Sequence, residues 1–347
     1  MTDFRDNPYY RHAPNGDRPL DVRDLERAYS AGRLVGCFVP KDQDAPWWAR
    51  RAGAYDLDQA VAELRIPVFG VGSSGERIEG TGKDKLCAPW HYYLRLDPSA
   101  AMKGAQKTGD CVSWGIRGAS DTTRCFDILG KGEPETYVKR QATCGIYAGR
   151  GHTGSGASPA RLSRYLVYIG IVLEQIYKTP KAEYDFRDYD QYVSWGMKRG
   201  SVGVPDDLRG ITMVHGPRTT SLVVGMEELK DLLWNGYGVH CGSGIGVSAY
   251  GNPVSRLKGS WAHDMQICGY DDRPETRKTF GETVFFWDQS WGDWNTLENL
   301  PEEWKPWGQG MFALTQSDTW KAVRQQGTWV FSNTDGFPAQ PIDNLLI

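Results

Sequence analysis

Gln106–Gly115, Q-K-T-G-D-C-V-S-W-G, is the stretch from which we interpret the whole sequence. It contains one cysteine, Cys111, with a glycine–aspartate turn before it and apolar residues at helical spacing after it. Asp110 is of a residue type that caps helix N-termini, so we predict a helix that carries Cys111 in its first turn. The N–H groups and the positive dipole end of such a turn stabilise a thiolate, which is the nucleophilic form of cysteine. A buried structural cysteine is the alternative, and this stretch alone favours neither.

Length, charge and hydropathy limit the number of domains that the chain can form and the kinds of partner that it can bind. The chain has 347 residues, enough for two packed domains or for one large domain with an extension. Its net charge of -3 gives no support for a nucleic-acid partner or for an anionic membrane. No apolar run approaches the roughly 20 residues that span a bilayer, and the polar N-terminus lacks the apolar core of a signal peptide. We therefore expect no nucleic-acid and no membrane partner, and a cytoplasmic location.

Cysteines and tryptophans indicate reduced thiols and a large aromatic core. The 7 cysteines are odd in number and include no C-x-x-C pair, so we predict neither a disulfide framework nor a metal or cofactor site. We interpret most of these cysteines as core residues. Half of the 14 tryptophans lie from Trp287 onwards. They favour the packing of a β-rich domain over an aromatic platform for a substrate.

The secondary-structure pattern changes near Asn235. Before it we predict helices, one of them at Ser158–Ile169 with Pro159 at the first helical position, and another at Met226–Trp234. Residues 133–156 are predicted to be rich in loops, and residues 180–220 to be irregular. After Asn235 we predict four strands: Val239–Ser248, His263–Tyr270, Thr283–Asp288 and Met311–Thr315. A helical half followed by a β-rich half indicates two subdomains with a cleft between them.

Two further chemical groups occur in the β-rich half. The segment W-A-H-D-M-Q-I-C-G-Y places His263 at the start of an alternating strand, where a neutral imidazole can take a thiol proton. Taken alone, a histidine with a structural role at a strand edge is the better interpretation. The segment F-F-W-D-Q-S-W-G offers Gln289 or Asp288 as an acceptor that fixes the tautomer of His263. In this arrangement Trp291 shields the hydrogen bond from water.

Together these segments resemble the papain-like cysteine peptidases, in which a cysteine, a histidine and an amide before Ser-Trp-Gly follow in this order. Gln106 before Gly109 and Cys111 resembles the Gln…Gly-x-Cys of the family, and residues 156–171, G-A-S-P-A-R-L-S-R-Y-L-V-Y-I-G-I, resemble its glycine pair, proline and following helix. The likeness extends over roughly residues 100–320. It implies an α+β fold with a helical subdomain, an antiparallel β-barrel-like subdomain and the active site in the cleft between them. The expected boundaries are 1–100 for an N-terminal extension, 101–222 and 223–335 for the two subdomains, and 336–347 for a tail.

The resemblance also implies a role for each site residue. Cys111 corresponds to the nucleophile, His263 to the base, and Gln289 to the amide that orients the base. Gln106 corresponds to the side chain that joins the Cys111 N–H in the oxyanion hole. Three further residues would contact the substrate, two along its backbone and one on the leaving-group side: Gly156, Ala157 and Trp291.

Five positions depart from the pattern of the family. Gln106 is one residue closer to the cysteine than the family has it, and Trp114 is three residues after the cysteine, whereas the usual tryptophan is adjacent. Gln289 stands in place of an asparagine, and Ala157 in place of a glycine. Asp264 follows the histidine where a small residue is usual, so a charge is expected near the imidazole. None of these changes removes the nucleophile or the base.

Three hypotheses follow from these residues. The first is a hydrolase that cleaves peptide or amide bonds by a Cys-His-Gln mechanism. The second is a structural or assembly protein that keeps the fold with weak or no catalysis, for example a virion component, and it is motivated by the five departures and by the N-terminal extension. G-D-C-V-S-W is also similar to phage-encoded members of the family, and such a protein would be particle-associated. The third is an acyl transferase, which differs from the hydrolase only in its acceptor. The N-terminal extension is expected either to inhibit as a pro-segment or to contact another copy or an assembly partner.

Overall fold

The computed structural model describes residues 78–101, 104–130, 138–248, 253–295, 303–304, 310–334 and 337. The predicted extension up to residue 77 lies outside the described residues, as does the predicted tail except for Phe337. Within the described residues the protein combines helices with a seven-stranded antiparallel sheet, so the predicted α+β fold is confirmed.

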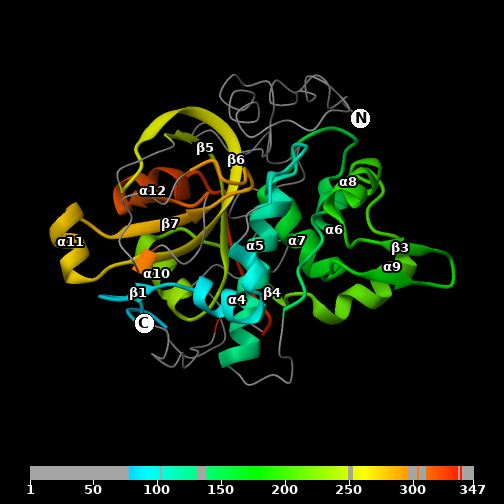
Figure 1. Ribbon diagram of the computed structural model, residues 1–347, viewed down its shortest axis with the longest axis horizontal. Coiled ribbons are helices and arrows are strands. Elements are labelled where there is room, and N and C mark those ends of the chain that lie inside the picture. Colours follow the sequence, from blue (N-terminus) through cyan, green and yellow to red (C-terminus); the bar gives the residue numbers. More distant parts are fainter. Residues whose placement is uncertain are drawn as a thin grey trace.

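The sheet forms the β-rich half of the protein (Figure 1). Its strands follow in the order β4-β9-β5-β6-β7-β8, and β1 pairs with β6 beside this path. Strand β6 is the longest, with 15 residues, and pairs with both β5 and β7. The strand bounds are β1 Leu86–Cys87, β4 Thr219–Leu222, β5 Val239–Val247, β6 Leu257–Asp271, β7 Val284–Asp288, β8 Phe312–Thr315 and β9 Thr328–Ser332; a separate hairpin comprises β2 Ile176–Lys178 and β3 Glu183–Asp185.

Helix α5 runs between the sheet and helices α6 to α9 (Figure 1). Helices α6 to α9, with the β2–β3 hairpin, form the helical half, whereas α10 to α12 accompany the sheet. Among the described residues, no helix has both the length and the apolar character needed to cross a membrane. The helix bounds are α4 Trp90–Leu96, α5 Cys111–Gly130, α6 Thr143–Tyr147, α7 Pro159–Ile169, α8 Tyr189–Lys198, α9 Asp206–Thr212, α10 Met226–Trp234, α11 Pro274–Phe280 and α12 Gln316–Val323.

The alternation of side chains along β6 separates an apolar face from a polar face. Met265 and Ile267 belong to the apolar core of the β-rich half. Asp264 and Gln266 point to the opposite face, toward α5, where Gln266 Nε2 donates to Thr122 Oγ1 at 2.8 Å. Helix α5 is therefore joined to the sheet through polar side chains.

Two glycines of α5 allow this close approach of helix and strand. A Cβ atom at Gly115 would lie 2.0 Å from Oδ1 of Asp264, and one at Gly118 would lie 2.3 Å from Oε1 of Gln266. A Cβ at either position would force the side chain of Asp264 or Gln266 to move. The two glycines thus leave room for these side chains between β6 and α5.

The local signals in the sequence predicted several elements well. Helix α7 begins as expected, because the Ser158 hydroxyl accepts from the Arg161 N–H at 3.3 Å and Pro159 occupies the first turn; such a cap contributes about 1 kcal/mol. It ends at Gly170, whose φ of 74° favours glycine. Helix α10 has the predicted bounds of Met226–Trp234.

Two expectations were wrong. Residues 180–220, predicted to be irregular, contain α8 and α9. A local signal was present, because the Asp188 carboxylate caps α8 by accepting from the Asp190 N–H at 2.9 Å. His263 lies in the interior of β6 rather than at its start, since this strand begins at Leu257.

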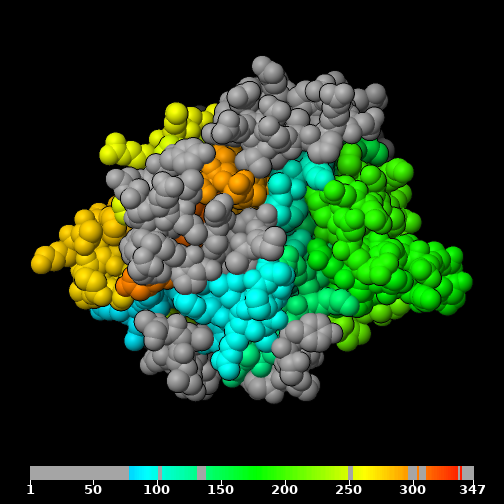
Figure 2. Space-filling view, in the orientation of Figure 1, coloured from blue at the N-terminus to red at the C-terminus, as the bar shows by residue number. Residues whose placement is uncertain are grey.

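Residues before 101 contribute to the packed body. Strand β1 pairs with Tyr270 and Asp271 of β6, and α4 packs against α5. The Trp90 ring contacts the Phe286 ring of the sheet edge-on, with centroids 5.2 Å apart. In the space-filling view this cyan segment lies between the green helical half and the gold and orange β-rich half (Figure 2). The packed body therefore begins earlier in the chain than the expected boundary at residue 101.

Candidate active site

Cys111 is the first residue of α5 and is fully buried. The carbonyl of Asp110 accepts from the Ser113 and Trp114 N–H groups, which closes the first turn of the helix. The Asp110 carboxylate accepts from the Tyr189 hydroxyl at 3.1 and 3.2 Å, and burial raises the pKa of Asp110 to about 7. Cys111 therefore occupies the predicted position at a helix N-terminus.

The Cys111 sulfur reaches across to the sheet. It accepts from the backbone N–H of Asp264 at 3.3 Å, and Asp264 is the residue that follows His263. This contact joins two groups that are far apart in the sequence. The structure thus brings the predicted nucleophile against the segment that carries the predicted base.

His263 is held on two sides. Its Nε2 lies 3.2 Å from Oε1 of Gln289, the residue after β7. The Trp291 ring stacks on the imidazole, with centroids 4.4 Å apart and an angle of 22° between the planes. Trp261 meets the imidazole edge-on at 5.7 Å. Burial lowers the pKa of His263 to about 3, although the hydrogen bond to Gln289 acts in the opposite direction.

The structure distinguishes between the two acceptors that the sequence offered for His263. Gln289 contacts the imidazole, whereas the Asp288 carboxylate accepts from the backbone N–H of Gln289 at 2.9 Å. Trp291 is fully buried beside this pair. The glutamine side chain therefore spans the distance to the ring despite its additional methylene.

Gln106 is buried between its own loop and the loop after β7. Its Nε2 donates to the Thr108 carbonyl at 2.6 Å, its Oε1 accepts from the Ser290 hydroxyl, and its backbone N–H donates to the Ser290 carbonyl at 2.8 Å. An amide nitrogen carries two N–H groups, and the Thr108 bond uses one of them. The side-chain amide of Gln106 is thus fixed by two hydrogen bonds, and its backbone by a third.

The predicted substrate edge lies next to the loop that precedes Cys111. The Gly156 N–H donates to the Gly109 carbonyl at 3.1 Å, two residues before Cys111. Gly156 has a φ of 76°, a conformation that favours glycine. Ala157 is fully buried in the same apolar core as Cys111. A Cβ is thus accommodated at position 157, where the family has a second glycine.

A buried arginine, which the sequence analysis did not identify, holds the loop of this edge. Arg150 is 2% exposed and donates to carbonyl groups of the loop after it and of the C-terminal end of α8. Its guanidinium also lies over the Tyr147 ring, 3.9 Å from the centroid. No short motif marks such a residue, because its partners are main-chain carbonyls; they belong to Tyr147, Thr153, Gly154, Gly196 and Met197.

The charge expected near the imidazole points away from it. The Asp264 carboxylate lies on the opposite face of β6, and its Oδ1 lies 3.0 Å from His240 Nδ1. Burial raises the pKa of Asp264 to about 6, and His240 acts to lower it. His240 is a second functional candidate that the sequence analysis missed, since V-H-C-G-S-G contains no recognisable motif.

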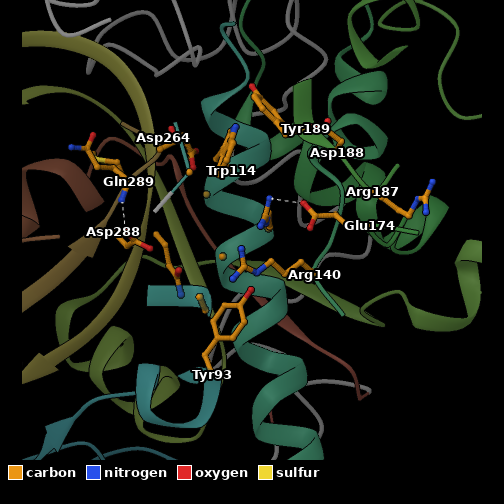
Figure 3. Close-up of a pocket in the computed structure, with 18 residues that line it drawn as sticks. Tyr93, Trp114, Arg140, Glu174, Arg187, Asp188, Tyr189, Asp264, Asp288 and Gln289 are labelled. Carbon is orange, nitrogen blue, oxygen red and sulfur yellow. Dashed lines mark hydrogen bonds and ion pairs between the residues drawn. The ribbon is translucent and has the colours of Figure 1, made fainter. Parts of the chain in front are cut away.

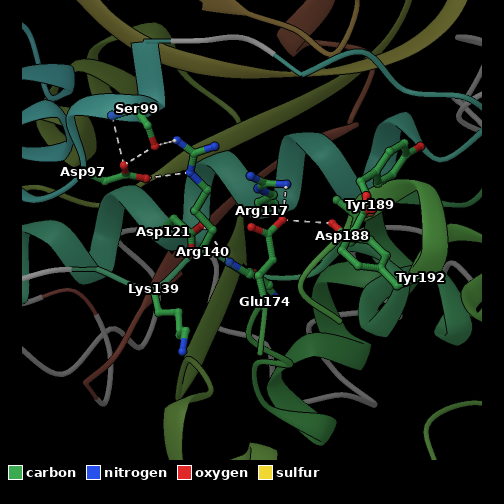
Figure 4. A network of polar contacts seen from close by, with 12 residues as sticks. Asp97, Ser99, Arg117, Asp121, Lys139, Arg140, Glu174, Asp188, Tyr189 and Tyr192 are labelled. Carbon is green, nitrogen blue, oxygen red and sulfur yellow. Dashed lines mark hydrogen bonds and ion pairs between the residues drawn. The ribbon is translucent and has the colours of Figure 1, made fainter. Parts of the chain in front are cut away.

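A pocket of about 460 Å³ reaches the site from the side of α5 (Figure 3). Asp264, Asp288 and Gln289 lie together on one wall, and Trp114 and Tyr189 lie on another. Its charged residues are largely paired. Arg117 donates to Glu174 at 3.1 Å, and Arg140 to Asp97 at 2.6 Å (Figure 4).

These pairs belong to a network that ties the segment before α5 to the helical half. Arg140 also donates to the Ser99 hydroxyl at 2.8 Å, and the Tyr93 hydroxyl donates to the Asp121 carboxylate at 3.2 Å. Within the described part of the chain, no three His, Cys, Asp or Glu side chains are grouped so that they could hold a metal ion.

No protein-family model and no curated protein sequence matches the chain. Several solved structures resemble it. Xylellain, a cysteine protease from Xylella fastidiosa, has a TM-score of 0.46 at 18% identity, over 78% of this chain and 94% of that one. Procathepsin B from Trypanosoma congolense has a TM-score of 0.43 at 13% identity, over 74% and 82% of the two chains. Procathepsin L 3 from the larval midgut of Tenebrio molitor has a TM-score of 0.43 at 12% identity, over 91% and 94%.

These structures are papain-like cysteine proteases, the family that the sequence resembles. Because the TM-scores lie below 0.5, we base the proposed function on the geometry of the site.

Proposed function

We propose that this protein is a cysteine hydrolase that cleaves peptide or amide bonds through an acyl-enzyme on Cys111. One observation carries the proposal: the sulfur at the start of α5 lies 3.3 Å from the backbone nitrogen of the residue that follows His263. A thiol at a helix N-terminus beside a buried imidazole is the arrangement that activates a cysteine nucleophile.

Hydrogen bonding supports an assignment of the proton on His263. Gln289 Oε1 can only accept, so Nε2 of His263 carries the N–H and Nδ1 is the basic nitrogen. Because burial lowers the pKa of His263 to about 3, the ring is neutral at pH 7 and can accept a proton. A neutral, oriented imidazole is the form that a general base requires.

The reaction then proceeds in two halves. Nδ1 of His263 takes the thiol proton of Cys111, the sulfur attacks the substrate carbonyl carbon, and the carbonyl oxygen becomes an oxyanion. As the tetrahedral intermediate collapses to a thioester, the same nitrogen returns the proton to the leaving amine. Water attacks the thioester next, giving its proton to His263, and the Cys111 thiol is released.

The oxyanion would be held by the Cys111 N–H and by the side-chain amide of Gln106. The two hydrogen bonds of the Gln106 side-chain amide support this role, because an amide that is already fixed needs no reorganisation in the transition state. Removal of one such donor typically lowers kcat by roughly 10²–10³. We assign the substrate backbone to Gly156 and Ala157, and the leaving-group side to Trp291.

The test is replacement of Cys111. The wild type should cleave some members of a mixed peptide library and should incorporate iodoacetamide at Cys111, and Cys111→Ala should do neither. Cys144→Ala is the matched control, because burial raises the pKa of the Cys144 thiol and makes it unreactive. The hydrolase proposal is wrong if the wild type shows neither turnover nor labelling of Cys111 under any condition that leaves the protein folded.

Complete burial of Cys111 and His263 favours a second candidate, a papain-like structural or assembly protein with weak or no catalysis. In that case residues 1–77 would contact an assembly partner or a second copy. Size-exclusion chromatography with light scattering would show large oligomers, and Cys111 would not react with iodoacetamide. If turnover occurs, added hydroxylamine separates transfer from hydrolysis, because an acyl transferase converts the acyl-enzyme to a hydroxamate in preference to an acid.

A further inference from the structure

Three buried polar side chains are linked in a row by hydrogen bonds near Cys111. The carboxylate of Asp264, on β6, contacts Nδ1 of His240, on β5, at 3.0 and 3.1 Å. Nε2 of His240 lies 2.8 Å from the hydroxyl of Ser163, on α7. Each of the three residues is at most 1% exposed. These three side chains thus connect α7 of the helical half with β5 and β6 of the sheet, and Asp264 contacts Cys111 through its backbone N–H.

The protons in this row of side chains can be assigned from its last member. The Ser163 hydroxyl donates its single hydrogen to the Pro159 carbonyl at 2.8 Å, because a carbonyl can only accept. The same oxygen must therefore accept from Nε2 of His240, so Nε2 carries a proton. The contact between Nδ1 and the Asp264 carboxylate needs one more proton, held by either partner. In both cases the His240–Asp264 pair has no net charge.

We propose that His240 is a positioning residue that keeps Asp264 in a charge-neutral pair, so that a carboxylate can lie buried between β6 and α5 without placing a net negative charge near the Cys111 sulfur. This inference rests on the proposed function, since it concerns the ionisation of the nucleophile. A single buried negative charge near the sulfur would oppose formation of the thiolate.

Two further observations support the pair. Burial raises the pKa of Asp264 to about 6 while His240 lowers it, as expected for a carboxyl group that shares a proton with its neighbour. The Phe331 ring of β9 stacks on His240, with an angle of 8° between the planes and centroids 5.7 Å apart, and fixes the plane of the imidazole. The same residue, Asp264, donates its backbone N–H to the sulfur of Cys111.

The row is not a second hydrolytic site, although Ser163, His240 and Asp264 have the order of a serine triad. The Ser163 hydroxyl is fully buried within α7 and donates to the carbonyl four residues before it. A substrate carbonyl has no access to this oxygen.

The protonation of His240 can be measured without catalysis. In the full chain labelled with ¹⁵N-histidine at pH 7, we expect Nε2 of His240 to carry a proton, with the resonance assigned by its loss in His240→Asn. A neutral ring that is protonated only at Nδ1 would leave the pair with a net negative charge and would refute the inference.

Two variants test the consequence for Cys111. In His240→Asn the amide can still donate to Asp264, but the proton on Nε2 is lost, so the pair becomes negative. We expect the apparent pKa of Cys111, measured from iodoacetamide rates against pH with mass spectrometry of the Cys111 peptide, to rise by about one unit, which lowers the rate below that pKa about tenfold. Adding Asp264→Asn restores neutrality and should recover most of the rate.

These outcomes test the neutral His240–Asp264 pair and the proposed function separately. Equal rates for His240→Asn and the double variant, both below the wild type, would show a structural role only and would contradict the charge argument. If Cys111 of the wild type does not react at all, the proposed function fails, and the ring protonation of His240 still decides whether the pair is neutral.

Discussion

His263 should make the stability of this protein depend on pH, and the sign of the effect distinguishes a neutral base from an ion pair. The imidazole is fully buried, and burial lowers its pKa to about 3 from an ordinary value of 6.5. The folded protein therefore resists protonation of His263, whereas the unfolded chain does not.

The magnitude follows from the two pKa values. Above pH 6.5 both states hold a neutral ring, and the contribution of His263 to stability is fully present. Below pH 6.5 the unfolded state binds a proton that the folded state does not bind until about pH 3. Each pH unit in this window lowers the free energy of unfolding by about 1.4 kcal/mol, so a change from pH 6.5 to pH 5 costs about 2 kcal/mol.

Urea unfolding at pH 7.5 and pH 5.0 measures this change in the wild type and in His263→Asn. We expect the wild type to lose about 2 kcal/mol more than the variant. Burial also lowers the pKa of His152 to about 3, but both proteins carry that residue, and its contribution cancels in the comparison. A smaller loss in the wild type than in the variant would refute the reasoning, because it would mean that folding raises the pKa of His263, as an ion pair with a Cys111 thiolate would.

Three other changes test the remaining parts of the site. Gln289→Ala should lower kcat at least roughly tenfold, because an unoriented ring loses part of the 10²–10⁴-fold that acid–base catalysis contributes, while Gln289→Asn, the family residue, should retain most of the activity; steady-state kinetics decide this. Arg150→Met should raise KM severalfold with little change in kcat and lower the free energy of unfolding by about 3 kcal/mol, because it leaves buried carbonyls unpaired; an unchanged KM would argue against its role at the substrate edge. Limited proteolysis that removes residues 1–77 but leaves β1 should raise the rate of Cys111 alkylation if that segment inhibits; an equal rate before and after cleavage would exclude a blocking pro-segment.

Local chemistry explains what could be predicted from the sequence. The start of α7 depends on Ser158 and Pro159, which are neighbours in the chain, and the start of α5 depends on the turn before Cys111. The bounds of α10 follow from acidic residues in its first turn and from its apolar spacing. Such signals need no knowledge of the rest of the fold. The family resemblance added the order of Cys111 and His263, which no local rule provides.

Long-range pairing explains what could not be predicted. Strands β4 and β9 are short and pair across more than 100 residues, so neither has a partner within any sequence window. Arg150 binds carbonyls, which every residue possesses, and its role becomes visible only when α8 and the glycine-rich loop come together. The sequence placed Asp264 near the imidazole but could not show that adjacent side chains of β6 face opposite sides of the strand at this point.

The carboxylate at position 264 accounts for two other features that have no evident cause in the sequence. A larger side chain after the histidine requires space on α5, and Gly115 provides it, since a Cβ there would lie 2.0 Å from Oδ1 of Asp264. A buried carboxylate also requires a partner, and His240 provides it from the neighbouring strand. Both residues are needed to accommodate Asp264. Gly115 without His240 would leave the carboxylate unpaired, and His240 without Gly115 would leave a steric clash between the carboxylate and α5. The unusual aspartate at position 264 is therefore accommodated by its surroundings, so that Cys111 and His263 can remain in place.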